Sequence, residues 1–349
     1  MFINAVSLAK AVGIILMVLA HTRFSEYGNL WINMFHMPLF FFLSGCCFKD
    51  SHLSDPKNFL IKKVKGLWWP FFKWMSLFVV FHNLLCFIGF YSDNPEFMGA
   101  KGEPVSYYQM MDYPGIFFNI IFMKHIEQLL GGFWFLKTLF YASLIGFCVI
   151  YIKKCCMIKV PFGLLVFILL SVCVISSWKA LFIPYLSVGP KEFLAALFFL
   201  IGYIYKSMDI SFRQYLFVLI PFSVIFITLG TEYWQMTLLN ITWWKIIPYL
   251  LGSMLASLTV YEICKLFPEK SVLTNYLIYI GDNTMTILTW HMLSFKLVNL
   301  IIIFTYGLSY YSVGAFPAIE QYAASGWFLI YLLVGIVVPC LFTRCRALK

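Results

Sequence analysis

Charged residues are scarce in this chain, and acidic residues are the scarcest. Only 11% of the 349 residues are Asp, Glu, Lys or Arg, with 15 acidic side chains against 25 basic ones. A soluble globular domain has about a quarter charged residues, so this deficit excludes one. The chain also lacks HExxH, P-loop, GxSxG or GxGxxG motifs in a supporting context. The familiar soluble enzymes built on those motifs are therefore excluded.

Metal-binding cysteine motifs are absent as well. The ten cysteines include two adjacent pairs, Cys46-Cys47 and Cys155-Cys156, but no CxxC. We therefore expect neither a metal site nor a disulfide framework, and we interpret the cysteines as small packing residues and reduced thiols.

Apolar residues are correspondingly abundant in this chain. The chain is 62% hydrophobic and 20% aromatic, with a mean hydropathy of +0.86. Ten apolar runs are long enough to cross a bilayer: 4–21, 31–48, 70–91, 133–152, 160–177, 191–206, 214–230, 243–264, 284–305 and 325–343. We predict an all-α, polytopic transmembrane helical bundle of about ten spans, forming one integral membrane domain over residues 1–349. Because the first run has no basic leader and contains Lys10, we expect a retained helix and not a cleaved signal peptide.

The basic residues set the predicted orientation. Fifteen of the 25 follow even-numbered runs and five follow odd-numbered ones, and such an excess marks the cytoplasmic side. We therefore predict that both termini are cytoplasmic and that the net charge of +10 reflects topology and not nucleic-acid binding. The outer segment 92–132 contains an apolar stretch at 114–128, which predicts an interfacial helix or, as an alternative, a re-entrant segment.

The first run carries two polar residues that an inert anchor does not need. Lys10 and His21 are eleven positions apart, so a helix places them on one stripe about 16 Å apart along its axis. Lys10 either snorkels to the headgroups or binds an anionic or carbonyl-bearing ligand. His21 is either a helix-end residue or a general base, because imidazole titrates near neutral pH.

A second histidine lies close to the first along the chain. His36 is about five residues into the second run, roughly 7 Å below its outer end. The short segment 22–30 predicts that the first two helices are antiparallel neighbours, so His21 and His36 could line one outward cavity. The alternative is a histidine that bonds a neighbouring helix.

Three lysines precede the third run on the predicted cytoplasmic side. Lys62, Lys63 and Lys65 stand just before a helix start, where ammonium and backbone N–H groups favour polyphosphates. Topology alone would also place basic residues there. Four further candidates for an acceptor site or cavity are Trp134, Lys137, Glu192 and His291. Their ordinary explanations are an aromatic belt, a helix dipole and buried polar pairing.

The chain resembles the membrane-bound acyltransferase-3 family, and within it the branch of fucose 4-O-acetylase-like and polysaccharide O-acetyltransferases. The similarity rests on Lys10-x10-His21, on FHMPLFFFLSG at 35–45, and on the weaker matches FWFL at 133–136 and FFLIGY at 198–203. Two positions depart from the family pattern. Ser7 replaces an acid, and Lys63 and Gly66 align with a cytoplasmic Arg-x-x-Arg, so lysine charges replace bidentate guanidinium contacts.

The resemblance implies transfer of an acyl group, usually acetyl, from cytoplasmic acyl-CoA to a sugar, polysaccharide or lipid-linked glycan in a bacterial cytoplasmic membrane. It implies His21 as general base, with His36 either orienting it or helping to stabilise the oxyanion. Lys10 would lie at the donor's arm, and the donor's phosphates would be held by Lys62, Lys63 and Lys65. Acetyl-CoA would be a co-substrate, with no bound cofactor. The alternatives are a transporter or flippase for a polysaccharide intermediate, which changes no covalent bond, and a regulatory or structural membrane subunit.

Overall fold

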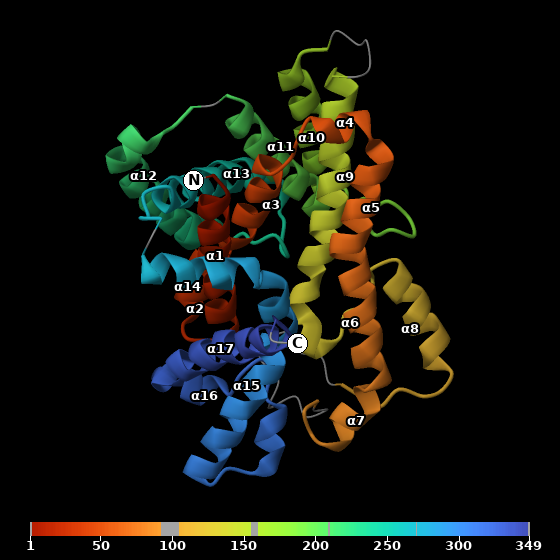
Figure 1. The fold of residues 1–349 in the computed structure, drawn as a ribbon. Helices are drawn as coiled ribbons and strands as arrows, with labels where there is room; N and C mark the ends of the chain where they lie inside the picture. The colour runs from red at the N-terminus through yellow and green to blue at the C-terminus, as the bar shows by residue number, and fades with distance from the viewer. Residues whose placement is uncertain (1, 92–104, 155–159, 209, 270, 348–349) are drawn as a thin grey trace. The chain divides into compact units, whose positions relative to one another are not determined.

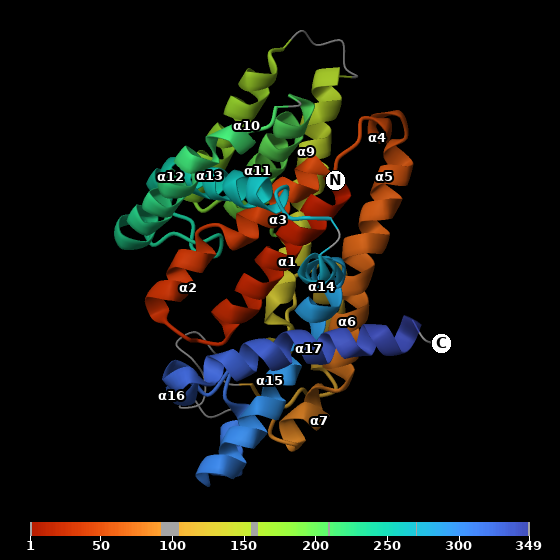
Figure 2. The ribbon, with the colours of Figure 1, turned by 60° about the vertical axis from the view of Figure 1, so that its left-hand side comes forward.

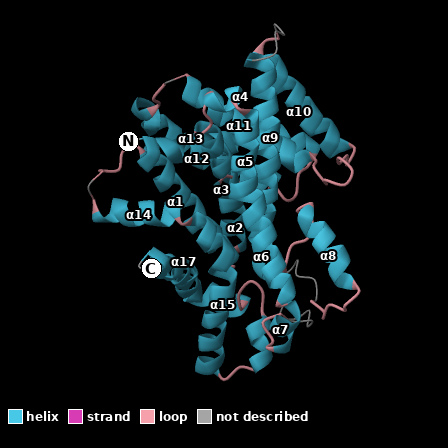
Figure 3. Ribbon diagram, turned by 45° about the vertical axis from the view of Figure 1, so that its right-hand side comes forward, coloured by secondary structure: helices cyan, strands magenta, loops and turns pink. Residues whose placement is uncertain are grey.

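The computed structural model describes residues 2–91, 105–154, 160–208, 210–269 and 271–347. Over these ranges the chain is helical, and no β-strand occurs apart from two isolated bridges (Figure 3). The chain divides into two compact units. The first comprises Met1–Gly13, Leu30–Pro70 and Phe135–Ile278, and the second comprises Ile14–Asn29, Phe71–Trp134 and Tyr279–Lys349. The prediction of one domain stays a prediction.

Within the described residues, six helical stretches are long and apolar enough to cross a membrane. They are Asn4–His21, Gln128–Lys154, Arg213–Trp234, Trp243–Cys264, Thr284–Tyr306 and Glu320–Thr343. Each coincides with a predicted apolar run, because hydropathy over a full bilayer thickness marks such helices. The all-helical membrane class is thereby confirmed, whereas the number of ten spans and the side of the termini stay predictions.

The first unit contains most of the helices in the middle of the chain (Figures 1 and 2). Its helices are the first part of α1 (Phe2–His21), α3 (His36–Cys46), α4 (Ser51–Ser54), α5 (Pro56–Lys63), α9 (Trp134–Lys154), α10 (Phe162–Trp178), α11 (Pro190–Ser207), α12 (Leu216–Leu229) and α13 (Ile246–Cys264). An apolar cluster joins α1, α3 and α13 through residues such as Ala9, Phe42 and Tyr261. This cluster fixes the first half of α1 against its neighbours in the first unit.

Two glycines bring α3 and α11 into backbone contact. A Cβ added at Gly45 would lie 1.9 Å from the carbonyl oxygen of Phe199, and one at Gly202 would lie 2.0 Å from that of Phe42. Small residues at facing positions let helices approach this closely. The motifs 35–45 and 198–203, identified separately in the sequence, therefore form a single packed contact.

The second predicted run is not one helix. α2 (Glu26–Asn33) ends before α3 begins at His36, and Phe35 has non-helical angles of φ −141° and ψ −22°. Such a break frees backbone carbonyls, which must find partners inside a membrane protein. The hydroxyl of Ser253 donates to the Met34 carbonyl, and the hydroxyl of Tyr249 donates to that of Asn33 at 3.4 Å. Side chains of α13 thus stabilise the break.

The second unit is built around two helices that pack on each other, α15 (Thr284–Tyr306) and α17 (Phe328–Ala347) (Figure 2). It also holds the end of α1, most of α6 (Trp69–Val80), α7 (His82–Phe87), α8 (Asp112–Ile121) and α16 (Glu320–Tyr322). The turn Gln128–Phe133 packs on α15, where a Cβ at Gly132 would lie 2.8 Å from Leu288. This contact connects the predicted outer segment to the helix that carries His291.

Three predicted boundaries differ from the structure. The run 70–91 divides into α6 and α7, since the helix ends at Val80. The predicted cytoplasmic segment after residue 264 contains a helix, α14 (Val272–Asp282), whose 11 residues are too few for a membrane-spanning run. Of the predicted outer segment, residues 92–104 lie outside the described residues, and the helix expected at 114–128 is α8, which ends at Ile121.

Candidate functional site

His21 forms a pair with His291 in the second unit. Nδ1 of His21 lies 2.9 Å from Nε2 of His291, and the two rings stack with centroids 5.1 Å apart and an interplanar angle of 14°. His21, at the end of α1, is partly buried, whereas His291, in the first half of α15, is fully buried. Two predicted site residues that are 270 positions apart therefore meet.

The hydrogen bonds of His291 define the tautomers of the pair. Nδ1 of His291 lies 2.9 Å from the Ile287 carbonyl oxygen and 3.1 Å from that of Leu288. Because a carbonyl only accepts, this nitrogen carries the proton. A fully buried imidazole favours its neutral form, so Nε2 of His291 accepts and Nδ1 of His21 donates. The remaining nitrogen of His21, Nε2, then has the lone pair that a general base needs.

His36 belongs to the first unit. It is 3% exposed at the start of α3, and its Nδ1 donates to the carbonyl of Ile32 at 2.8 Å. This bond within the chain's own turn fixes the imidazole at the break between α2 and α3. Its predicted place beside His21 stays a prediction.

Four lysines of the first unit lie within electrostatic range of the exposed thiol of Cys47, which directly follows α3. Lys10, Lys206, Lys63 and Lys49 all act on this thiol electrostatically. Lys206 also donates to the carbonyl of Phe48 at 3.3 Å. We call these four residues the lysine cluster. A concentration of ammonium groups that come from α1, α5, α11 and the segment between α3 and α4 favours a polyanion.

The lysine cluster includes only Lys63 of the three lysines predicted for the donor site, which are Lys62, Lys63 and Lys65. Lys62 and Lys65 are exposed, whereas Lys63 is half-buried, with its ammonium 5.5 Å from the centroid of the Phe59 ring. Consecutive helical residues are separated by about 100°, so these three side chains project in different directions. Burial lowers the pKa of Lys63 to about 8.

The remaining sequence candidates have local partners. Lys137 is buried and donates to the Ser187 carbonyl at 3.0 Å. Glu192 is buried at the start of α11, where it accepts from the backbone N–H of Gly189 at 2.9 Å and from the Thr138 hydroxyl at 3.2 Å. The carboxylate therefore caps a helix. Trp134 opens α9 and is partly buried in the second unit.

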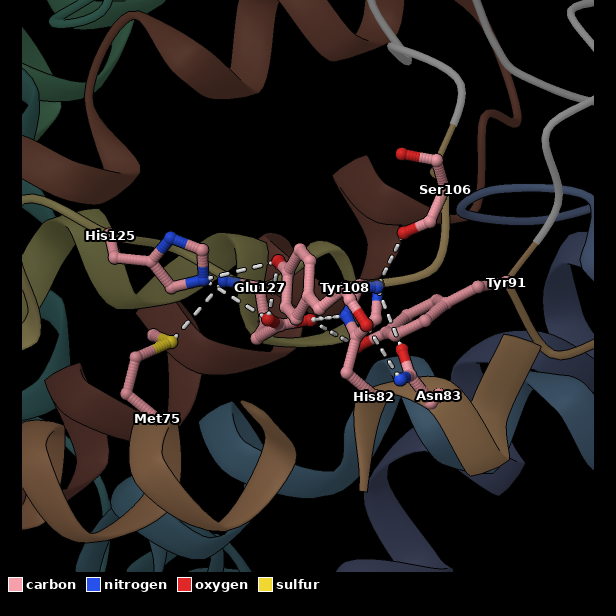
Figure 4. Close-up of polar contacts among 8 residues, drawn as sticks. All are labelled: Met75, His82, Asn83, Tyr91, Ser106, Tyr108, His125 and Glu127. Carbon is pink, nitrogen blue, oxygen red and sulfur yellow. Dashed lines mark hydrogen bonds and ion pairs between the residues drawn. The ribbon is translucent and has the colours of Figure 1, made fainter. Parts of the chain in front are cut away.

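A further polar cluster, not identified from the sequence, surrounds Glu127 (Figure 4). The carboxylate is buried and accepts four hydrogen bonds. The donors are Nδ1 of His82 at 2.9 Å, Nε2 of His125 at 3.0 Å, and the hydroxyls of Tyr91 at 3.0 Å and Tyr108 at 2.9 Å. We call these five residues the Glu127 cluster. No group of three His, Cys, Asp or Glu side chains in the described ranges has metal-binding geometry.

The Glu127 cluster anchors the outer segment to α7. The Tyr108 ring stacks on His82 with centroids 3.5 Å apart, and the Asn83 amide exchanges two hydrogen bonds with the Tyr108 backbone at 2.8 and 2.9 Å. One face of the Tyr108 ring is thus covered by protein, whereas Tyr107 is 58% exposed. The sequence offered no signal for this cluster because its members are dispersed over about 45 positions.

The Glu127 cluster predicts an acid-sensitive stability. Burial alone would raise the pKa of Glu127, but the hydrogen bonds from His125 and His82 outweigh it and lower the pKa from 4.5 to about 2. A lowered folded-state pKa stabilises the fold above the unfolded-state value, and this stabilisation is lost as pH falls from about 4.5 towards 2. We expect the thermal midpoint of the wild type to fall by roughly 5 °C more than that of Glu127→Gln between pH 5 and pH 2.5.

Thermal unfolding of the detergent-solubilised protein at several pH values measures this difference. Glu26→Gln, at an exposed carboxylate, is the matched control and should follow the wild type. Parallel pH profiles for the wild type and Glu127→Gln would contradict the assignment.

Comparison with known proteins gives one match. A family model described as an acyltransferase domain, of the acyltransferase-3 type, covers residues 3–344, which includes both histidines of the pair and all four lysines of the cluster. No curated protein and no solved structure matches the chain. The narrower fucose 4-O-acetylase-like branch stays a prediction. With nearly its whole length matched, and with six helices in its described part able to cross a bilayer, the chain belongs to the acyltransferase-3 family of membrane acyltransferases.

Proposed function

We propose that this protein is a membrane O-acyltransferase that moves an acyl group, most simply acetyl, from cytoplasmic acyl-CoA to a hydroxyl of a cell-surface sugar or polysaccharide. The observation that carries the proposal is the His21–His291 pair, in which a buried imidazole on helix carbonyls orients a second imidazole at a helix end. Acyl transfer to an alcohol needs such a base, because the hydroxyl proton must leave as the oxygen attacks.

In the proposed reaction, Nε2 of His21 takes the proton of the acceptor hydroxyl while the hydroxyl oxygen attacks the thioester carbonyl. The carbon–sulfur bond then breaks, and the CoA thiolate leaves and recovers a proton from the imidazolium. Transfer by way of an acetyl-His21 intermediate is the other route, and each route conserves atoms and protons. In both, the hydrogen bond from His21 to His291 fixes the reacting nitrogen.

The lysine cluster of the first unit supports a donor site for acyl-CoA. Lys10 belongs to this cluster and shares α1 with His21, about 16 Å away along the helix. We infer that Lys63, Lys49 and Lys206 contact the CoA phosphates and that Lys10 contacts the arm between phosphate and thioester. The orientation predicted from the Lys and Arg distribution would place these lysines on the cytoplasmic side, in a bacterial cytoplasmic membrane.

The experiment that tests the function uses membranes that contain the protein. They are given acetyl-CoA labelled in the acetyl group, together with the organism's own surface polysaccharide after alkaline removal of its O-acetyl groups. We expect label in the polysaccharide as alkali-labile ester. If deletion of the gene leaves the polysaccharide acetylated but retained inside the cell, the transport alternative is correct.

Lys63 gives the donor site a pH dependence. Because burial lowers its pKa to about 8, the ammonium is charged below that pH and neutral above it. Phosphate binds the charged form, so affinity for acetyl-CoA should fall as pH rises through about 8. We expect a loss of roughly tenfold between pH 7 and pH 9.5, the value of one hydrogen bond to a charged group.

Titration calorimetry of the purified protein with CoA measures this loss. Lys63→Arg keeps its charge over the whole range and should abolish the decline. Lys62→Arg, at the exposed neighbouring position, should leave it unchanged. A decline that persists in Lys63→Arg would assign the pH dependence to another group.

A further inference from the structure

The Glu127 cluster contains two imidazoles, those of His82 and His125, and only the imidazole of His82 is hydrogen-bonded through both ring nitrogens among the described residues. His82 donates through both nitrogens, because Nδ1 faces the Glu127 carboxylate at 2.9 Å and Nε2 faces the Ser106 carbonyl oxygen at 3.0 Å. Two acceptors require two protons, so His82 is an imidazolium. Its charge balances that of Glu127.

Because His82 already supplies the counter-charge of Glu127, the hydrogen bond from His125 to this carboxylate does not require a second imidazolium. Nε2 of His125 donates to Oε1 of Glu127 at 3.0 Å, so in the neutral ring Nδ1 has the lone pair. No hydrogen bond to Nδ1 of His125 occurs among the described residues, and Figure 4 shows this nitrogen on the side of the ring away from Glu127. The side chain is 19% exposed, whereas that of Glu127 is 1% exposed.

The carboxylate behind this imidazole is itself rigidly held. Burial raises the pKa of the Tyr108 phenol and so preserves its proton, and that hydroxyl donates to the same oxygen, Oε1 of Glu127, at 2.9 Å. The backbone N–H of Glu127 lies 3.2 Å from the sulfur of Met75. An imidazole aimed by a fixed carboxylate presents its other nitrogen in a defined direction, as required of a group that recognises a ligand.

We propose that Nδ1 of His125 accepts a hydrogen bond from a hydroxyl of the carbohydrate acceptor, which makes His125 an acceptor-binding residue of the second unit. A neutral imidazole nitrogen with a lone pair selects ligands that donate, and a polyhydroxylated sugar is the donor class that the proposed function supplies. The proposal thus rests on that function for the identity of the ligand. The Gln128–Phe133 turn, which directly follows Glu127, packs on α15 beside Leu288 and Met292, close in sequence to His291.

Two substitutions of His125 separate the hydrogen bond of its Nε2 to Glu127 from the proposed acceptor role of its Nδ1. His125→Gln places an amide N–H near the position of Nε2, so the bond to Glu127 is kept while the acceptor at Nδ1 is lost. His125→Asn places an amide oxygen near the position of Nδ1 and loses the bond to Glu127. Binding of the full-length, detergent-solubilised protein to the immobilised, de-O-acetylated surface polysaccharide of the organism is measured without acetyl-CoA, and thermal midpoints are measured in parallel.

We expect His125→Gln to keep the thermal midpoint and to bind the polysaccharide about tenfold more weakly, the loss of one hydrogen bond. His125→Asn should lower the midpoint and bind more tightly than His125→Gln. Equal affinity of His125→Gln and the wild type would overturn the proposal, as would a wild type that does not bind the polysaccharide. If His125→Gln also lowers the midpoint, the relative affinities of the two variants decide, and a weaker His125→Asn refutes the role of Nδ1.

A failure of the proposed acyl transfer and a failure of the His125 proposal would give different experimental results. His21→Asn should still bind the polysaccharide and should transfer no acetyl group. A wild type that binds the polysaccharide in a His125-dependent manner without acetylating it would disprove the acyl acceptor chemistry and leave the binding site standing. If the wild type transfers the acetyl group and His125→Gln binds the polysaccharide as tightly as the wild type, the binding role of His125 is disproved and the proposed function stands.

Discussion

His21→Ala should lower the rate of acetyl transfer by about 10² to 10⁴, the range expected when a general base is removed. The physical reason is the tautomer that the structure imposes. Nδ1 of His21 donates to His291 at 2.9 Å, so the proton-accepting nitrogen of the pair is Nε2 of His21. Without it, the acceptor hydroxyl must attack as an undissociated alcohol. Single-turnover transfer from labelled acetyl-CoA in membranes measures the loss.

The matched control for this prediction is His21→Asn. The Asn amide places an N–H near the position of Nδ1, so the hydrogen bond to His291 can persist while the base at Nε2 is absent. We expect His21→Asn to be as inactive as His21→Ala and to keep the wild-type thermal midpoint and CoA affinity. Activity within threefold of the wild type in either variant would show that another group removes the proton.

His291→Ala should lower kcat by about 10² with little change in the KM for acetyl-CoA. His291 does not itself take the hydroxyl proton in the proposed reaction. It is a positioning residue, because its Nε2 accepts from His21 while its Nδ1 is bonded to the carbonyls of Ile287 and Leu288. Removal frees the His21 ring to rotate and to adopt the other tautomer, and loss of an orienting partner has large effects on imidazole bases.

Rescue distinguishes positioning from packing. His291→Gln places an amide oxygen near Nε2, where it can accept from His21, and should recover at least tenfold of the lost kcat. His291→Leu fills similar space without an acceptor and should not recover it. If His291→Leu and His291→Gln are equally active, the contact serves only the packing of α15.

The position of Lys10 and His21 on the same side of one helix was predictable, because it depends only on helical periodicity. α1 runs unbroken from Phe2 to His21, so the spacing of eleven residues fixes the relation between the two side chains. The partner of His21 was not predictable in the same way. Proximity along the chain favoured His36, whose place beside His21 stays a prediction, and the structure brings His291 to His21 from 270 positions away.

The lysines show the same limit. Lys62, Lys63 and Lys65 are neighbours in sequence, yet a helix turns them apart, and Lys63 is joined instead by Lys10, Lys49 and Lys206 around Cys47. Counting basic residues between apolar runs gave their expected side of the membrane and no information about which of them converge. Convergence depends on how α1, α3, α5 and α11 pack, which is decided by features such as the backbone contact at Gly45 and Gly202.

The sequence alone determined the membrane class and six helices that, among the residues the structure describes, are long enough to span a bilayer. It also determined the acyltransferase-3 resemblance, which a family match over residues 3–344 confirms. Hydropathy and helical periodicity are properties of a short stretch of sequence. Because a bilayer requires a long apolar helix, these two properties are enough to identify a membrane-spanning segment. Only the tertiary structure paired His21 with His291, assembled the lysine cluster and placed four donors around Glu127. Those arrangements depend on close packing between distant segments, and no periodicity in the chain encodes that packing.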